Sequence, residues 1–72
     1  MTRDEFLIEM QDVLQTEEEL TLDMALADIP EWDSLAIMST MAFLDSRMGV
    51  KTGMTDYNAM KTIGDIADKA GI

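Results

Sequence analysis

The sequence contains no cysteine and no histidine, and it has a single proline among its 72 residues. Without cysteine, no disulfide can cross-link the fold and no thiolate can bind a metal. The commonest general base and the strongest nucleophile are also missing, because neither histidine nor cysteine is present. Zinc would have only carboxylate ligands, and no segment has the spacing of a calcium-binding EF-hand loop. This inventory argues against a small enzyme and predicts no catalytic residue and no metal site.

Basic residues are also scarce, since five Lys and Arg face fifteen Asp and Glu, which gives a formal net charge of −10. Such a chain is repelled by nucleic-acid phosphates and by anionic membranes, so neither is expected as a partner. Proteins with basic surfaces are favoured instead. No apolar run approaches the length of about 20 residues that a membrane span needs. The acidic start, Met1–Glu5, does not resemble a secretion signal, and we expect a cytoplasmic protein.

The length predicts one domain, residues 1–72, and the 47% of apolar residues allow a small core. A helix is predicted from Arg3 to Gln15, because Thr2 and Glu5 have the spacing of a capping box. Apolar residues recur after it at intervals of three and four and form one stripe: Phe6, Leu7, Met10, Val13 and Leu14.

Residues 16–33 break this pattern. Apolar residues partly alternate here, which would suit a strand, but no second strand is available to pair with it. Pro30 also prevents Ile29 from continuing a helix. We therefore predict a long loop whose apolar residues attach it to the helices.

A second long helix is predicted to begin at Ser34 with Asp33 as its N-cap and to end at Gly49. Its expected apolar face comprises Leu35, Ile37, Met38, Met41, Leu44 and Met48.

A short helical turn is predicted over residues 55–60 with Thr55 as its cap, and Thr62 is expected to cap a last helix that ends at Gly71. Asp65 takes the position of the capping box where Glu or Gln is usual. The apolar face of this helix consists of Ile63, Ile66, Ala67 and Ala70. The fold class is therefore all-α, a small four-helix bundle with three main helices and one short one.

The segment Glu31–Leu35 is the one place where chemistry is expected. The long loop delivers Ser34 to the first turn of a helix, where its hydroxyl points outward. Free amides and the helix dipole favour a negative group at this position, so a phosphodiester on Ser34 would lie in a favourable field. Asp-Ser-Leu alone is a weak signal, because Asp-Ser is a common way to begin any helix.

Three further features make the sequence resemble the acyl carrier protein family. Asp33-Ser34-Leu35 is similar to the attachment motif of that family, and Trp32 precedes it as in many carrier domains. Residues 43–50, with the sequence Phe-Leu-Asp-Ser-Arg-Met-Gly-Val, resemble the end of the family's helix. Residues 62–66, Thr-Ile-Gly-Asp-Ile, resemble the opening of its last helix. The resemblance extends over essentially the whole chain.

The resemblance implies a 4'-phosphopantetheine arm on Ser34, flanked by Asp33 and Leu35. A phosphopantetheinyl transferase would move the arm from coenzyme A, and the arm's thiol would hold acyl or aminoacyl groups as thioesters. Further implied partners are a loading ligase or transferase and downstream synthases of fatty-acid, polyketide or related biosynthesis. The carrier itself would be a monomer without catalytic activity.

Four apolar residues on the helix after the serine are candidates for contact with partner enzymes: Leu35, Ile37, Met38 and Met41. Methionine adapts to several partners but also fills irregular cores, so core packing is the alternative role. Typical fatty-acid carriers are rich in acids on this helix, whereas this sequence has Ala36, Ser39, Thr40 and Ser46 at such positions. This difference indicates a specialised carrier. An unmodified helical interaction module with the same fold is the competing interpretation.

Overall fold

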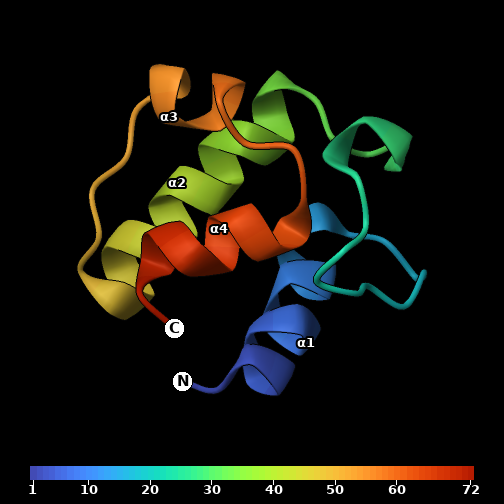
Figure 1. Ribbon diagram of the computed structural model, residues 1–72, viewed down its shortest axis with the longest axis horizontal. Helices are drawn as coiled ribbons and strands as arrows, with labels where there is room; N and C mark the ends of the chain where they lie inside the picture. Colours follow the sequence, from blue (N-terminus) through green and yellow to red (C-terminus); the bar gives the residue numbers. More distant parts are fainter.

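Four α-helices and one short 3₁₀ turn form the computed structural model, which describes all 72 residues (Figure 1). The elements are α1 (Arg3–Leu14), the 3₁₀ turn η1 (Leu26–Asp28), α2 (Ser34–Met48), α3 (Met54–Asn58) and α4 (Ile63–Ala70). None of these helices combines the length and apolarity that crossing a bilayer would require. The two chain ends lie on the same side of the molecule (Figure 1), where Arg3 and Asp68 form an ion pair of 2.7 Å. The small all-α bundle that the sequence predicts is confirmed.

The predicted starts of the two long helices are confirmed by their hydrogen bonds. The Thr2 hydroxyl accepts from the Glu5 amide at 3.1 Å, and the Glu5 carboxylate accepts from the Thr2 amide at 3.0 Å. These two bonds satisfy amides that have no partner within the helix. The bond that the Glu5 carboxylate accepts from the Thr2 amide also lowers the pKa of Glu5. At α2, Asp33 Oδ1 accepts from the amide of Ala36 at 2.9 Å.

Asp65 completes the capping box of α4 although the residue is shorter than the usual Glu or Gln. Its Oδ2 accepts from the amides of Lys61 at 2.7 Å and Thr62 at 3.1 Å, while the Thr62 hydroxyl accepts from the Asp65 amide. The hydrogen bond from Lys61, followed by that from Thr62, lowers the pKa of Asp65. One carboxylate oxygen thus satisfies two amides before the helix.

The predicted cap of the short helix is wrong. Helix α3 begins at Met54, and Gly53 takes the N-cap position that was assigned to Thr55. Asp56 explains the difference, because its Oδ2 accepts from the Gly53 amide at 2.8 Å and fixes the helix start two residues earlier.

The core forms where the inner faces of α1, α2 and α4 meet the long loop. The predicted faces of α1 and α4 are confirmed, since Phe6, Met10 and Leu14 are buried on α1 and all four predicted residues are buried on α4. The buried residues of the core cluster are Phe6, Met10, Leu14, Leu20, Leu26, Ile29, Ala36, Phe43, Leu44, Ile63, Ile66, Ala67 and Ala70.

The predicted apolar face of α2 is confirmed at Leu44, which is buried, and at Met48, which packs against the core, but it is wrong at Leu35 and Met38. The buried residues of α2 are Ala36, Thr40, Phe43 and Leu44, whereas Leu35 and Met38 are 72% and 58% exposed. Apolar residues occur on both sides of this helix, so spacing alone does not choose the inner one. Thr40 is buried without cost to its hydroxyl, which donates to the Ala36 carbonyl at 2.8 Å.

The long loop is attached to the helices as expected. Leu20, Leu26 and Ile29 are buried in the core. The loop also exchanges backbone hydrogen bonds with the start of α4, including Gly64 N to Leu22 O at 2.7 Å. Only one isolated bridge joins the two segments, which confirms that no strand forms. The turn η1 was not predicted.

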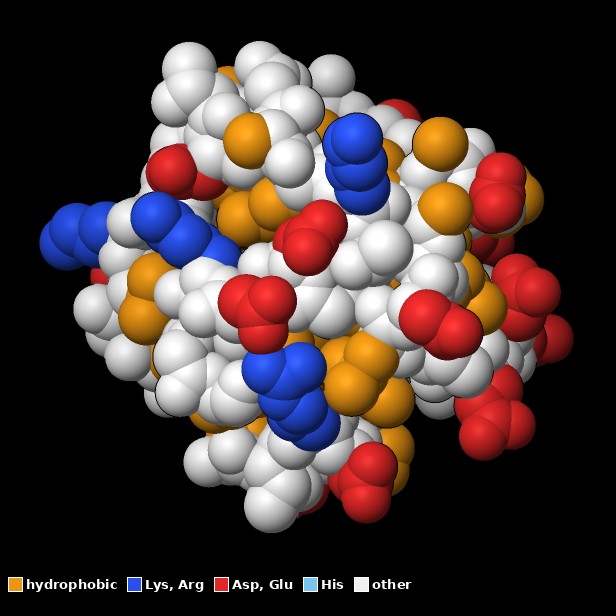
Figure 2. Space-filling view, viewed as in Figure 1, with side chains coloured by type: hydrophobic (Ala, Val, Ile, Leu, Met, Phe, Trp, Pro, Cys, Tyr) orange, Lys and Arg blue, Asp and Glu red, His pale blue; other side chains and the backbone are white.

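Charge is distributed unevenly over the surface. In the view of Figure 2, acidic side chains dominate the edge on the right, where the loop between α1 and α2 runs in Figure 1. Four of the five basic residues form ion pairs with acids on other parts of the fold, namely Arg3, Arg47, Lys51 and Lys69. The loop acids Glu17, Glu18 and Glu19 have no basic partner.

Candidate functional site

Ser34 is the first residue of α2, and it lies exposed at the point where the long loop enters the helix. The extended backbone of Asp33 and its bond to the Ala36 amide define this start. The amides of Ser34 and Leu35 make no hydrogen bond within the protein, because the first turn of a helix has no carbonyl to offer them. An exposed hydroxyl therefore stands beside two free amide donors at the positive end of the helix dipole.

No side chain forms a hydrogen bond with the Ser34 hydroxyl. A general base that would activate it as a nucleophile is therefore missing from its surroundings. No group of three acidic side chains lies close enough together to hold a metal ion. Ser34 is thus an exposed serine at a helix start without a neighbouring hydrogen-bonded side chain.

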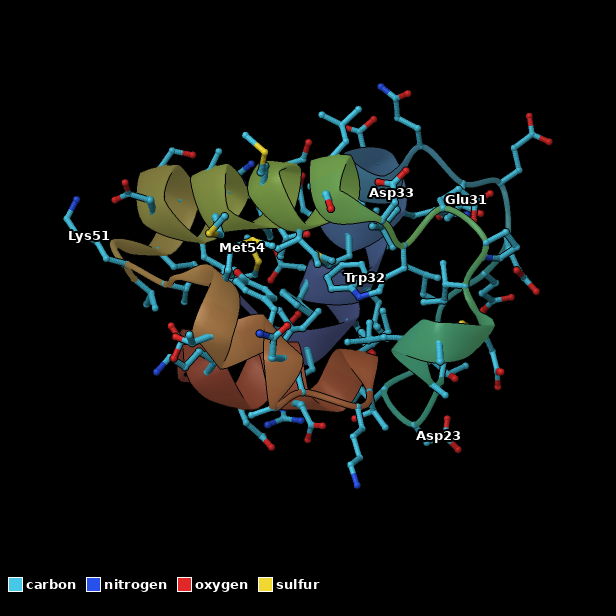
Figure 3. All side chains as sticks on the ribbon, turned by 90° about the horizontal axis from the view of Figure 1, so that it is seen from above. Asp23, Glu31, Trp32, Asp33, Lys51 and Met54 are labelled. Carbon is cyan, nitrogen blue, oxygen red and sulfur yellow. The ribbon has the colours of Figure 1, made fainter.

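Trp32 fixes the loop immediately before the site. Its amide donates to the Ile29 carbonyl at 3.0 Å, and its half-buried indole packs against the core. The ring lies between α2 and the helices below it in Figure 3, while Asp33 points away at the start of α2. The ring centroids of Trp32 and Tyr57 are 6.2 Å apart with an interplanar angle of 47°. This contact connects Trp32, which is two residues before Ser34, to α3.

Tyr57 is itself held in place. It is buried, and its hydroxyl shares a hydrogen bond of 2.9 Å with the Thr52 hydroxyl. Burial raises the pKa of the phenol, so Tyr57 is neutral around pH 7. A neutral, hydrogen-bonded ring gives Trp32 a rigid surface to pack on.

The four apolar residues singled out on α2 lie partly or wholly on its outer side. Leu35 and Met38 are exposed, while Ile37 and Met41 are half-buried and do not join the core cluster. Core packing is therefore not the role of Leu35 and Met38. Met54 on α3 adds another exposed apolar side chain.

A surface depression of about 300 Å³ adjoins Leu35 on the other flank of the site. The end of α1, the long loop and the start of α2 form its walls, and its lining consists of Val13, Leu14, Gln15, Glu31, Asp33, Leu35, Ala36 and Ser39.

Two residues of this depression were not singled out from the sequence. Gln15 has left-handed backbone geometry with φ of 53°, a conformation that costs about 1–2 kcal/mol for a residue other than glycine. Glu31 Oε1 is buried without a hydrogen-bond partner. The Gln15 geometry is that of the C-cap which ends α1, a position where glycine would be the usual sequence signal.

Comparison with known proteins gives one informative result. The fold matches the solution NMR structure of a holo acyl carrier protein from Geobacter metallireducens with a TM-score of 0.77 and 26% sequence identity. The match covers 94% of this chain and 79% of that one. No family model and no curated protein sequence matches the chain. The chain resembles the acyl carrier proteins in sequence motif and in the arrangement of its helices.

Proposed function

We propose that this chain is a carrier protein whose 4'-phosphopantetheine arm is attached to Ser34. The observation that carries the proposal is the exposed hydroxyl at the first position of α2, in a fold that matches a holo acyl carrier protein. That likeness supports a carrier role, and the absence of histidine and cysteine is consistent with one. The thiol of the attached group would hold acyl or aminoacyl cargo as a thioester.

The residues around Ser34 suit such an attachment. The free amides of Ser34 and Leu35, together with the helix dipole, favour the negative charge of a phosphodiester. Helix α2 has no acidic residue in its first turn to oppose that charge, although the Asp33 carboxylate stands at the cap. Because Asp33 already binds the Ala36 amide, its charge is partly neutralised by the helix end.

Partner enzymes would dock on the outer side of α2. Leu35 and Met38 project there without core contacts, and Ile37 and Met41 extend the apolar area along the helix. A tethered cargo reaches each docked enzyme at a high effective concentration, so binding to α2 can be weak and reversible. We assign this surface to the phosphopantetheinyl transferase, to the loading ligase or transferase and to downstream synthases of fatty-acid, polyketide or related pathways. We place the protein in the cytoplasm as a monomeric, single-domain carrier (residues 1–72) without catalytic activity.

Intact mass measurement tests the attachment. The protein is incubated with coenzyme A, magnesium and a broad-specificity phosphopantetheinyl transferase. We expect a gain of one phosphopantetheine in the wild-type chain and in Ser46→Ala, which changes another exposed serine of α2, and no gain in Ser34→Ala. If several active transferases leave the wild-type mass unchanged, the proposal fails and an unmodified interaction module takes its place.

A rate measurement with the same transferase tests the docking surface. Leu35→Ala and Met38→Ala should each slow modification, while Ile8→Ala, which removes an equally exposed side chain from α1, should not. Equal rates for all three variants would remove the assigned role of α2.

A further inference from the structure

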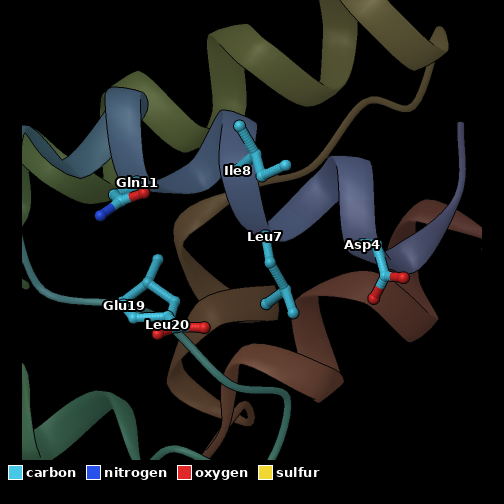
Figure 4. Close-up of a pocket in the computed structure, with 6 residues that line it drawn as sticks. All are labelled: Asp4, Leu7, Ile8, Gln11, Glu19 and Leu20. Carbon is cyan, nitrogen blue, oxygen red and sulfur yellow. The ribbon is translucent and has the colours of Figure 1, made fainter.

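We propose that the outer face of α1 and the acidic loop beside it form a second docking surface, which binds a basic amphipathic helix of a partner protein. This surface, here called the α1 groove, is lined by Asp4, Leu7, Ile8, Gln11, Glu19 and Leu20 (Figure 4). It lies on α1 and the loop rather than on the outer side of α2, so it requires neither Ser34 nor an attached arm.

The α1 groove combines an apolar floor with a projecting apolar side chain. Leu7 extends toward the loop that carries Leu20, and the space between the two elements measures about 240 Å³ (Figure 4). Ile8 projects beside it and is 69% exposed, close to the value for Leu35 at the carrier site. A β-branched aliphatic side chain gains nothing from such exposure, whereas burial by a partner would stabilise a complex.

The loop wall of the groove is fixed before any partner arrives. The Gln11 side chain donates to the backbone carbonyls of Glu17 and Glu18 at 3.2 and 3.1 Å. Leu20 is buried and anchors the loop from below. A wall that is already ordered lowers the entropy lost on binding.

The charges around the groove define the partner. Asp4 and Glu19 line it, and Asp12, Glu17 and Glu18 lie nearby on the same elements, all without an ion pair. Arg3 on α1 pairs with Asp68, and Arg47 pairs with Glu9 on α1, and neither acid lines the groove.

Two other kinds of occupant are disfavoured by this arrangement. A second copy of the chain would bring the same negative charge, and anionic lipid would be repelled for the same reason. A helix with aliphatic residues on one side and Lys or Arg at its flanks satisfies both the apolar floor and the acidic rim.

The test is an NMR titration of the ¹⁵N-labelled Ser34→Ala chain with a defined Leu/Lys amphipathic helical peptide. A peptide of the same composition in scrambled order is the control. We expect saturable shifts at Leu7, Ile8, Gln11 and Leu20 with the amphipathic peptide only. Shifts spread evenly over all acidic surfaces, or equal binding of the scrambled peptide, would overturn the proposal.

Ile8→Glu separates a specific groove from simple charge attraction. This exposed position tolerates glutamate, which is also a better helix former than isoleucine. The variant adds negative charge, so the affinity for the basic peptide would rise if binding were purely electrostatic. If the peptide binds in the α1 groove, the affinity should fall at least about tenfold, because the buried apolar side chain is lost. Met54→Glu makes the same charge change on α3 and should leave binding at the groove unweakened. If Ile8→Glu binds the amphipathic peptide as tightly as the parent chain does, the proposal is contradicted.

Discussion

The indole of Trp32 and the phenol of Tyr57 pack with their ring centroids 6.2 Å apart, and this contact joins the loop before Ser34 to α3. Trp32 is the single tryptophan of the chain, so tryptophan fluorescence reports on the surroundings of this one ring. Tyr57→Ala should lower the free energy of unfolding by about 3 kcal/mol and shift the Trp32 emission to longer wavelength. Tyr57→Phe should cost only about 1 kcal/mol, for the hydrogen bond to Thr52, and leave the emission unchanged. Chemical denaturation followed by fluorescence measures both quantities, and an unchanged emission in Tyr57→Ala would contradict the packing described.

Gly64 lies in α4 where the long loop crosses the helix. A Cβ at this position would lie 2.9 Å from the Leu22 carbonyl oxygen, which also accepts the 2.7 Å hydrogen bond from the Gly64 amide. Alanine usually stabilises a helix interior relative to glycine, yet here we expect Gly64→Ala to lower the free energy of unfolding by about 1–3 kcal/mol. Gly53→Ala, where nothing lies within 4 Å of the added Cβ, is the comparison variant and should lose less stability, because only the N-cap preference for glycine over alanine is lost there. A stabilised Gly64→Ala would show that the loop does not cross α4 this closely.

The contribution of the Asp65 carboxylate to the stability of the fold depends on pH. Hydrogen bonds from the Lys61 and Thr62 amides lower its pKa in the folded protein. The ionised cap therefore stabilises the fold above the unfolded pKa of an aspartate, and this contribution is lost as the pH falls through the lowered folded value. Asp65→Asn should melt at a lower temperature than wild type at pH 7, and the difference should shrink on acidification.

Asp12→Asn is the control for this experiment, since Asp12 is exposed on α1 and makes no ion pair. It removes the same charge without removing a cap. A melting difference between Asp65→Asn and wild type that stays constant down to acidic pH would refute the role of the carboxylate.

Glu31 lines the depression beside the candidate site with one buried oxygen that has no hydrogen-bond partner. Glu31→Met should raise the free energy of unfolding by about 1 kcal/mol, because it removes the unsatisfied oxygen. Glu19→Met removes an equal charge from an exposed position and should stabilise less. Thermal melts rank the two variants.

The rate of Ser34 modification gives a second measurement on the same variant. If Glu31→Met also slows modification of Ser34, the unsatisfied oxygen serves recognition at a cost in stability. A Glu31→Met variant that melts no higher than Glu19→Met would contradict this assignment.

The net charge of −10 predicts that ionic strength controls stability. Most carboxylates outside the four ion pairs repel one another across a small surface, and dissolved ions screen this repulsion. The melting temperature should rise with added sodium chloride or magnesium chloride relative to a low-salt buffer. A flat or falling dependence would mean that self-repulsion does not limit the fold.

Local signals in the sequence determined the secondary structure and the position of the candidate site. Capping depends on residues three positions apart, so Thr2, Asp33 and Thr62 identified three helix starts correctly. The start of α3 was missed because its capping carboxylate, Asp56, serves a glycine that carries no side-chain signal.

Only the tertiary structure decided which side of α2 is buried. Apolar residues occupy both sides of this helix. The buried side is the one on which Ala36, Phe43 and Leu44 pack against the core residues of α1, α4 and the loop. The exposure of Leu35 and Met38 follows from that choice. The α1 groove likewise exists only after Gln11 binds the loop carbonyls. The sequence alone therefore located Ser34, whereas long-range packing determined the surfaces that surround it.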